Sequence, residues 1–218
     1  MSDVTLARPD TSDMIRVHRV FRESLGTAPQ LIGSVRETDA DRVATVASYY
    51  ANVLAFLHVH HEGEDALVWP RLLDRCPGDA ATITRVAAQH EGVLAVLNGA
   101  ESRLAEWQAE PTTDRGAVLA AALITLCVNL SAHLDDEERL ILPLVAEHLT
   151  VAEWGELPMH GMQHFTGDKM WLVIGLIREQ MTEEQCAGMD AEMPPPVRQF
   201  WVAQGEPLFR AFIAEVRR

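Results

Sequence analysis

The sequence predicts an all-α protein, an up-down-up-down four-helix bundle with a C-terminal helical appendage. Apolar residues recur at helical spacing in four long stretches, which short connections separate. No stretch alternates between apolar and polar residues for long enough to compete as a strand. The 218 residues can bury a substantial core. We therefore expect the bundle in residues 10–150 and the appendage, packed on it, in residues 151–218.

The first two helices are marked by breakers at their ends. Thr11, Ser12 and Asp13 are candidate N-caps of the first helix, Gly26 is a stop, and Pro29 is expected to kink a rod that then continues. The second helix is predicted over residues 40–76, with weak points at Gly63 and Pro70.

The third and fourth helices are predicted over residues 80–108 and 114–148, the latter bent near Pro143. Short connections between long helices imply antiparallel neighbours. In the appendage, Thr150 begins a capping-box pattern and an apolar helix covers residues 168–181. A proline run then breaks the chain before one last helix or pair of helices.

Composition limits the classes of partner. The formal charge is −14, from 32 acidic against 18 basic side chains, so nucleic acids and anionic membranes would be repelled. The most apolar run, residues 117–132, is too short and too often interrupted by polar residues for a membrane span, and it fits a buried bundle helix. Three cysteines without metal-type spacing, and a first ten residues without an apolar stretch, favour a reducing cytoplasm.

Nine histidines suggest the chemistry. None has a carboxylate three residues before it, which disfavours the ferritin-type arrangement. Five have one four residues later, on the same helix face. Among these, His60–Glu64 and His133–Glu137 share a proline ten residues after the histidine, so we predict that these two pairs are counterparts.

The candidate ligands agree in depth along the bundle. Counted from the turns that join their helices, His90 and His133 stand at nearly equal distances, and so do His18 and His60. The connection from His60 to His90 differs by roughly 7 Å, which the bend at Pro70 can absorb. The sequence thus predicts one cluster of six ligand-type side chains: His18, His60, Glu64, His90, His133 and Glu137.

Such a cluster indicates a metal. Buried ionisable groups without partners are costly, and a cation supplies the partner. A single histidine in a bundle is more often an ordinary packed residue, but six ligand-type side chains at one level, four histidines and two glutamates, are not. Imidazoles with two carboxylates able to bridge suit a pair of iron ions better than one tetrahedral zinc, and they leave coordination positions open.

The pattern resembles the hemerythrin-like (HHE cation-binding) family over residues 10–150. The resemblance is carried by "HRVFR", "HHEGEDALVWP", "QHEGV" and "HLDDEERLILP", and the tail with "TVAEW" and "PPPVRQFW" is similar to an extension of actinobacterial members. It implies a non-heme diiron centre with an oxo or hydroxo bridge. His18 and His60 would hold one iron, His90 and His133 the other, and Glu64 and Glu137 would bridge.

Two departures bear on activity. Oxygen-carrying members have a further histidine where this chain has Leu94, and they end with HxxxxD where it has HxxxE. With one imidazole fewer, we expect the second iron to be more open, which favours handling of peroxide or nitric oxide over transport. His58 and His61 are expected to point elsewhere. His160 and His164 either approach the bundle's open end, as a fifth imidazole or a gate, or lie on a helix surface.

The leading hypothesis is therefore a cytoplasmic diiron protein that binds or reduces a small oxidant, namely dioxygen, hydrogen peroxide or nitric oxide. The alternatives are an iron- or oxygen-responsive sensor and a carrier of oxygen or iron without turnover. The sequence leaves open whether the protein is a diiron oxidoreductase, which molecule donates electrons, and the oligomeric state.

Overall fold

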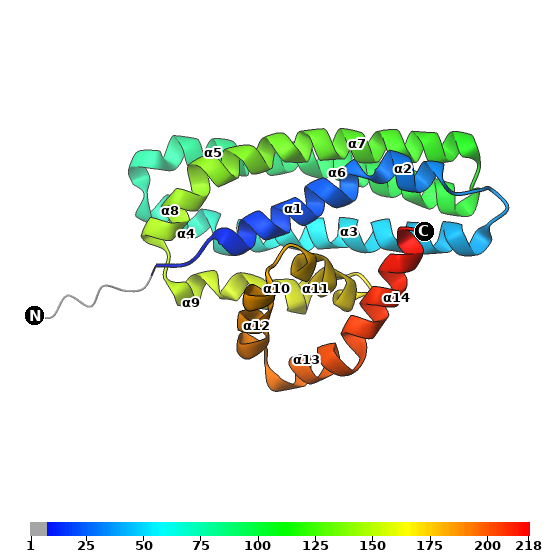
Figure 1. The fold of residues 1–218 in the computed structure, drawn as a ribbon. Coiled ribbons are helices and arrows are strands. Elements are labelled where there is room, and N and C mark those ends of the chain that lie inside the picture. Colours follow the sequence, from blue (N-terminus) through cyan, green and yellow to red (C-terminus); the bar gives the residue numbers. More distant parts are fainter. Residues whose placement is uncertain (1–7) are drawn as a thin grey trace, which may run out of the picture.

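The computed structural model describes residues 8–218, and this range contains helices and loops but no strand (Figure 1). Four rods run antiparallel along the bundle, which confirms the predicted fold class. The expectation about a signal sequence concerns residues 1–10, of which residues 1–7 lie outside the described range. The rods are α1 (Ser12–Gly26) with α2 (Ala28–Gly33); α3 (Ala40–Leu67) with α4 (Trp69–Arg75); the turn η1 (Pro77–Asp79) with α5 (Ala80–Ala87) and α6 (Gln89–Ala109); and α7 (Thr113–Asp136) with the π-helical turn η2 (Glu137–Ile141) and α8 (Leu142–His148).

The breaks within the rods follow the predicted kinks in part. Thr27 separates α1 from α2, as expected from the stop before Pro29. The second rod breaks at Val68, because Pro70 opens α4 and cannot donate a backbone hydrogen bond, whereas Gly63 stays inside α3. The break at Ala88 between α5 and α6 carries no proline or glycine, and the sequence did not predict it.

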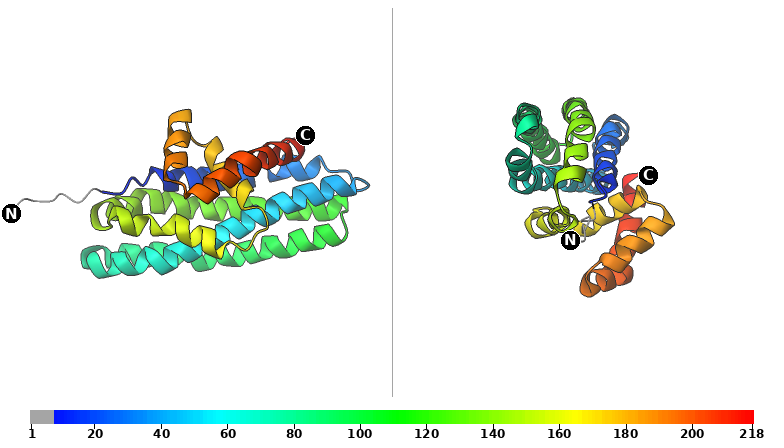
Figure 2. Two further views of the ribbon diagram at one scale, coloured as in Figure 1. Left: turned by 90° about the horizontal axis from the view of Figure 1, so that it is seen from below. Right: turned by 90° about the vertical axis from the view of Figure 1, so that its left-hand side faces the viewer.

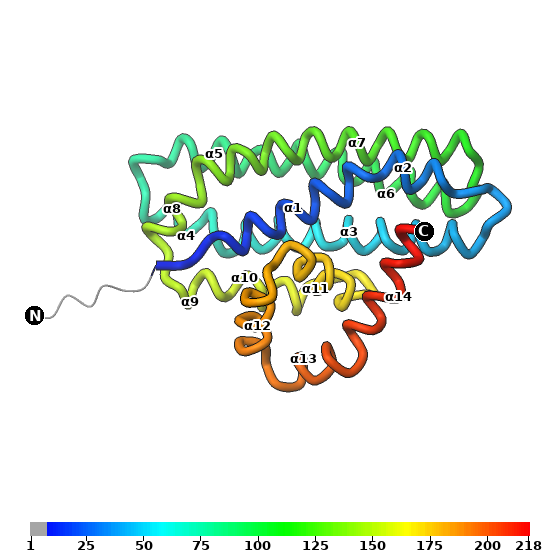
Figure 3. Tube along the Cα trace, in the orientation of Figure 1, coloured from blue at the N-terminus to red at the C-terminus, as the bar shows by residue number. Residues whose placement is uncertain are grey.

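The apolar core of the bundle is divided in two. One part includes Phe21 and Leu57, fills the middle of the bundle and extends to Leu172 of the appendage. The other part includes Met14 and Val145 and fills the end of the bundle near α4 and α8. A belt of buried polar side chains lies between these two parts, and every rod contributes to it. The tube in Figure 3 shows the four rods running side by side.

The appendage lies along one side of the bundle (Figure 2). Its helices α10 and α14 contact α3, and α11 contacts α1 and α3. Thr150 caps α9 with the predicted capping box. The helix α12 was not predicted from the sequence, because it has little apolar periodicity. The elements are α9 (Val151–Trp154), α10 (Glu156–His164), α11 (Met170–Glu179), α12 (Glu183–Glu192), α13 (Pro195–Phe200), η3 (Trp201–Gly205) and α14 (Glu206–Val216).

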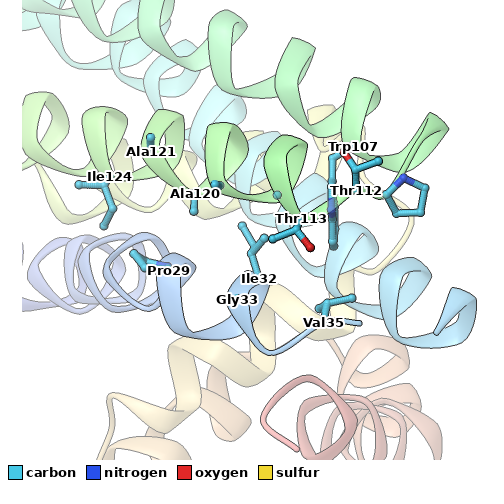
Figure 4. A pocket seen from close by; sticks show the side chains of 13 residues that line it. Pro29, Ile32, Gly33, Val35, Trp107, Thr112, Thr113, Ala120, Ala121 and Ile124 are labelled. Carbon is cyan, nitrogen blue, oxygen red and sulfur yellow. The ribbon is translucent and has the colours of Figure 1, made fainter. Parts of the chain in front are cut away.

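The rod from Thr113 to His148 lies on the edge of the bundle away from the appendage (Figure 1). It is long and apolar enough to cross a membrane by length and composition, and a third of its most apolar window is buried. An apolar groove of about 470 Å³ runs between α2 and α7, lined by residues such as Ile32 and Ala121 (Figure 4). On α7 the groove reaches only as far as Ile124, well short of His133.

Candidate metal centre

The polar belt brings together the six side chains that the sequence predicts and one more. Two groups of potential ligand atoms form, and within each group the atoms lie within 4.8 Å of one another. Glu64 belongs to both groups. The first group contains His18, His60, Glu64 and Glu137, and the second contains His61, Glu64, His90 and His133.

The first group forms between α1, α3 and η2. His18 and His60 face each other with ring centroids 5.4 Å apart and planes nearly perpendicular. His18 Nε2 lies 3.4 Å from Glu137 Oε2, and His60 Nε2 lies 3.2 Å from Glu64 Oε1. The carboxylates of Glu64 and Glu137 and the side chain of His18 are at most 1 % exposed, so these contacts are sheltered from water.

The second group forms between α3, α6 and α7. The Nε2 atoms of His90 and His133 are 3.2 Å apart, and Glu64 Oε2 lies 3.3 Å from His90 Nε2. His61 stacks on His90 with ring centroids 4.1 Å apart. Glu64 therefore directs one oxygen to each group, and Glu137 Oε2, at 3.8 Å from His133 Nε2, also lies near both.

Contacts outside the belt fix the proton positions of the second group. His90 Nδ1 lies 2.8 Å from the Asp65 carboxylate, and since a carboxylate accepts, Nδ1 donates. The Gln89 amide donates to Asp136 at 3.0 Å, which leaves its oxygen to accept from His133 Nδ1 at 3.1 Å. Both imidazoles therefore carry their proton on Nδ1 and present an unprotonated Nε2 to the belt.

His18 is oriented in the same way by the π-helical turn. Its Nδ1 donates to Glu138 Oε1 at 2.8 Å, and Arg22 holds the same oxygen at 2.7 Å. The wider π turn lets the consecutive residues Glu137 and Glu138 both reach His18, one at each ring nitrogen. π-helical turns of this kind occur frequently at functional sites.

These groups fit a cation. Two unprotonated Nε2 atoms at 3.2 Å repel each other unless a positive charge lies between them. Several further belt atoms are buried without a hydrogen-bond partner, which is costly for a polar atom unless a cation binds it. They are His18 Nε2, His60 Nε2, His61 Nε2, Glu64 Oε1, Glu64 Oε2 and Glu137 Oε2.

The pKa values of Glu64, Glu137 and His18 are all shifted by burial and by their charged neighbours in the belt. Burial, and then the charge of Glu137, raise the pKa of Glu64 well above its usual range. Burial also acts to raise the pKa of Glu137, but His18 and the other imidazoles outweigh it and lower that pKa to about 2. Burial acts to lower the pKa of His18, but Glu137 and Glu138 outweigh it and raise that pKa above its ordinary value.

His60, His61 and His133 are uncharged and so can act as metal ligands without first losing a proton. Burial lowers the pKa of His60 and of His61 well below the ordinary histidine value, and neighbouring imidazoles lower both further. Burial is also the largest cause that lowers the pKa of His133, to about 4. These three histidines are therefore uncharged at neutral pH, with one ring nitrogen free of a proton, as metal binding requires.

Proton release on metal binding follows from these pKa shifts. Of the groups described, His18 and Glu64 have raised pKa values and must lose their protons to bind a cation, so anaerobic ferrous iron should displace roughly one to two protons per chain near pH 7. The apparent affinity should rise with pH through the pKa values of His18 and Glu64 in the metal-free protein and level off above them. Calorimetric titration in buffers of different ionisation enthalpy measures the release. Proton uptake, or an affinity that does not change with pH, would contradict the assignment.

The placement of His61 corrects the sequence analysis. His61 was expected to point away with His58, but it is 7 % exposed and lies in the second group, while His58 pairs with Glu101 near the surface. The inference that Leu94 leaves the second group one imidazole short is wrong for the same reason, because His61 supplies a third. Leu94 itself is 43 % exposed.

The appendage histidines belong to neither group. His160 and His164 stack on each other with ring centroids 4.3 Å apart. A Cβ added to Gly63 would lie 3.3 Å from the His160 ring, so this ring packs against α3 one residue before Glu64. His160 therefore contacts α3 from the side of the appendage, and neither His160 nor His164 is a member of the two groups of ligand atoms.

Comparison with known proteins agrees with this geometry. No curated protein and no solved structure matches the chain. The family model for the hemerythrin HHE cation binding domain matches residues 10–145, which contain every member of the two groups. The chain accordingly belongs to the hemerythrin family of HHE cation-binding domains.

Proposed function

We propose that this protein holds two iron ions, one in each group, and that it binds or reduces a small oxidant there: dioxygen, hydrogen peroxide or nitric oxide. The single observation that carries the proposal is the position of Glu64, whose two oxygens face different groups of otherwise unpartnered ligand atoms. A carboxylate in this position can bridge two cations, whereas a site for one ion would not need it.

The ligand types favour iron. Mixed imidazole and carboxylate sets suit iron, and a structural zinc site would close a tetrahedron with four ligands. When bound, the iron pair supplies open coordination positions and redox electrons. The chain supplies the orientation of each imidazole, through Glu138, Asp65 and Gln89.

The first group is the more open of the two. It has two imidazoles and two carboxylates, whereas the second group has three imidazoles, Glu64 and, at 3.8 Å from His133, the shared Glu137. A small exogenous ligand is therefore expected on the side of His18 and His60. Phe21, fully buried and with its ring centroid 5.2 Å from that of His60, lines this side and keeps it apolar. A dry surrounding suits an uncharged ligand such as dioxygen or nitric oxide and limits side reactions with water.

Optical spectra of the iron-loaded protein test the proposal. Spectra are recorded before and after addition of dioxygen, hydrogen peroxide or nitric oxide, and consumption of each is followed over many equivalents. Binding without turnover would identify a carrier, and sustained consumption would identify an enzyme. If none of the three changes the spectrum, the proposed function is wrong.

A sensor is the second candidate, and the contact of α10 with α3 favours it. Leu157 and His160 pack against Gly63, the residue before Glu64, so movement of this helix on metal binding would reach the appendage. A sensor predicts metal-dependent hydrogen exchange in α10 and no turnover. An α10 whose exchange is the same with and without iron would exclude it.

The location proposed is the cytoplasm. Cys76, Cys127 and Cys186 are free thiols, which agrees with a reducing compartment. The acidic surface agrees with a partner that is a small molecule and not a nucleic acid.

A further inference from the structure

The exposed edge of α7 carries a heptad stripe. Eight residues alternate at spacings of four and three, the pattern by which one helix packs along another. All eight are exposed in the single chain, and the two valines are 49 % and 65 % exposed. Seven lie on α7 and the last on the π-helical turn η2 that follows it: Asp114, Val118, Ala121, Thr125, Val128, Ala132, Asp135 and Arg139.

This stripe is uncharged except at its ends. The chain has a formal charge of −14, yet residues 116–134 contain no Asp, Glu, Lys or Arg. The inner positions are small or β-branched, so a second helix can approach closely without burying a charge. The helix α7 lies on the side of the bundle away from the appendage, as the end-on view in Figure 2 shows. Ala121 also borders the groove beside α2.

We propose that two copies of this chain associate through α7, as an antiparallel two-helix coiled coil about a two-fold axis. In an antiparallel coiled coil, each core position of type a on one helix lies opposite a core position of type d on the other helix. The register that respects this rule and centres the uncharged run places Thr125 against Val128 of the second copy, and Ala121 against Ala132. Both pairings occur twice by symmetry, as an isologous interface requires.

The ends of the stripe select this register. It places Asp114 opposite Arg139 of the second copy at both ends, and both side chains are exposed. Arg139 Nη2 already donates to Asp136 of its own chain at 2.7 Å, so Asp114 of the second copy would bind the other N–H groups of the guanidinium. Asp135, which faces Val118 of the second copy, is already neutralised by Arg22 at 2.7 Å. A parallel arrangement would place Asp114 against Asp114 and Arg139 against Arg139, so charge complementarity favours the antiparallel pair.

The surface fits a second copy better than other occupants. A membrane would also take an apolar helix, but both ends of the stripe carry charged side chains. The chain as a whole has a formal charge of −14, which anionic lipids would repel. The interface would have eight layers of side chains. From Asp114 to Arg139 these layers extend over about 37 Å, at 1.5 Å per residue. An interface of this small size should give a reversible dimer, with a dissociation constant in roughly the micromolar range.

Sedimentation velocity of the metal-loaded full chain tests the proposal. Between about 1 and 100 µM the protein should shift from one to two chains per particle. Val128→Glu places a carboxylate in the two central layers and should weaken association by about a hundredfold. Val202→Glu is the matched control, because Val202 is 64 % exposed on the appendage, and it should leave the dimer unchanged.

Charge reversal tests the register independently of folding. Asp114→Arg should weaken the dimer, as should Arg139→Asp, and the double variant should restore it because the ends are complementary again. A monomer at every concentration, with or without binding to vesicles, would overturn the proposal. A dimer that survives Val128→Glu, or a double variant weaker than both single variants, would overturn it as well.

Discussion

Replacing Glu64 by glutamine is expected to remove both cations from the protein. Glu64 is fully buried, offers one oxygen to each group, and has no hydrogen-bond partner for either oxygen. Glutamine keeps its shape but removes the charge and replaces one oxygen with an amide nitrogen, which does not bind a cation. Iron content per chain after desalting should fall to near zero, a greater loss than the roughly tenfold to hundredfold effect typical of residues that only orient ligands.

The stability of the metal-free protein separates this loss from misfolding. Because burial raises the pKa of Glu64, the ionised carboxylate costs free energy in the metal-free fold, and glutamine relieves that cost. The thermal midpoint of metal-free Glu64→Gln should therefore equal or exceed that of the metal-free parent. Glu62→Gln, at an exposed position two residues earlier, should keep the full iron content. Two tightly held irons in Glu64→Gln would contradict the assignment.

Replacing His61 by alanine is expected to remove one cation and leave the other. His61 lies in the group with His90 and His133, so its loss should empty that group, while His18 and His60 still hold an ion with Glu137. Iron analysis should give about half the parent content, and the optical features that need both ions should vanish.

Two neighbouring histidines serve as controls for this result. His58→Ala should change nothing at the centre, because His58 faces Glu101 at 30 % side-chain exposure. His60→Ala should give the complementary half-loss, in the first group. If His61→Ala kept both irons while circular dichroism showed an intact fold, His61 would be a packing residue and the second group would have only two imidazoles.

The sequence was sufficient for the bundle and for the level of the site. Helical spacing and short connections predicted the four rods, and counting residues from the turns brought His18, His60, His90 and His133 to one level, where the structure places them. This worked because the rise of an α-helix is nearly constant, so depth in a bundle can be counted.

His61 was not predicted as a ligand because each helix was expected to present ligands on one face only. α3 packs between α1 and α6, and residues one apart on a helix point about 100° apart, so His60 can face α1 while His61 faces α6. The double histidine was itself the signal. It predicts ligands for two neighbours whenever a helix lies between two others that carry histidines.

The irregular backbone around the site could be predicted only in part. Val68, Ala88 and η2 interrupt three rods within four residues of a ligand. Val68 and the end of η2 each stand two residues before a proline where the sequence predicts a weak point or bend, whereas Ala88 has no such signal and the π-helical form of η2 was not predicted. A π turn depends on which side chains it satisfies, here Glu137 and Glu138 with His18, and those contacts come from another rod. Local propensity carries no such information.

The number of iron ions per chain tests the central claim most directly. Protein loaded with ferrous iron without oxygen, then separated from free metal, should contain two irons per chain by elemental analysis, one for each of the two groups. The same analysis after loading with a mixture of iron and zinc should still give two ions. A single ion per chain at saturation, of either metal, would contradict a two-ion centre bridged by Glu64.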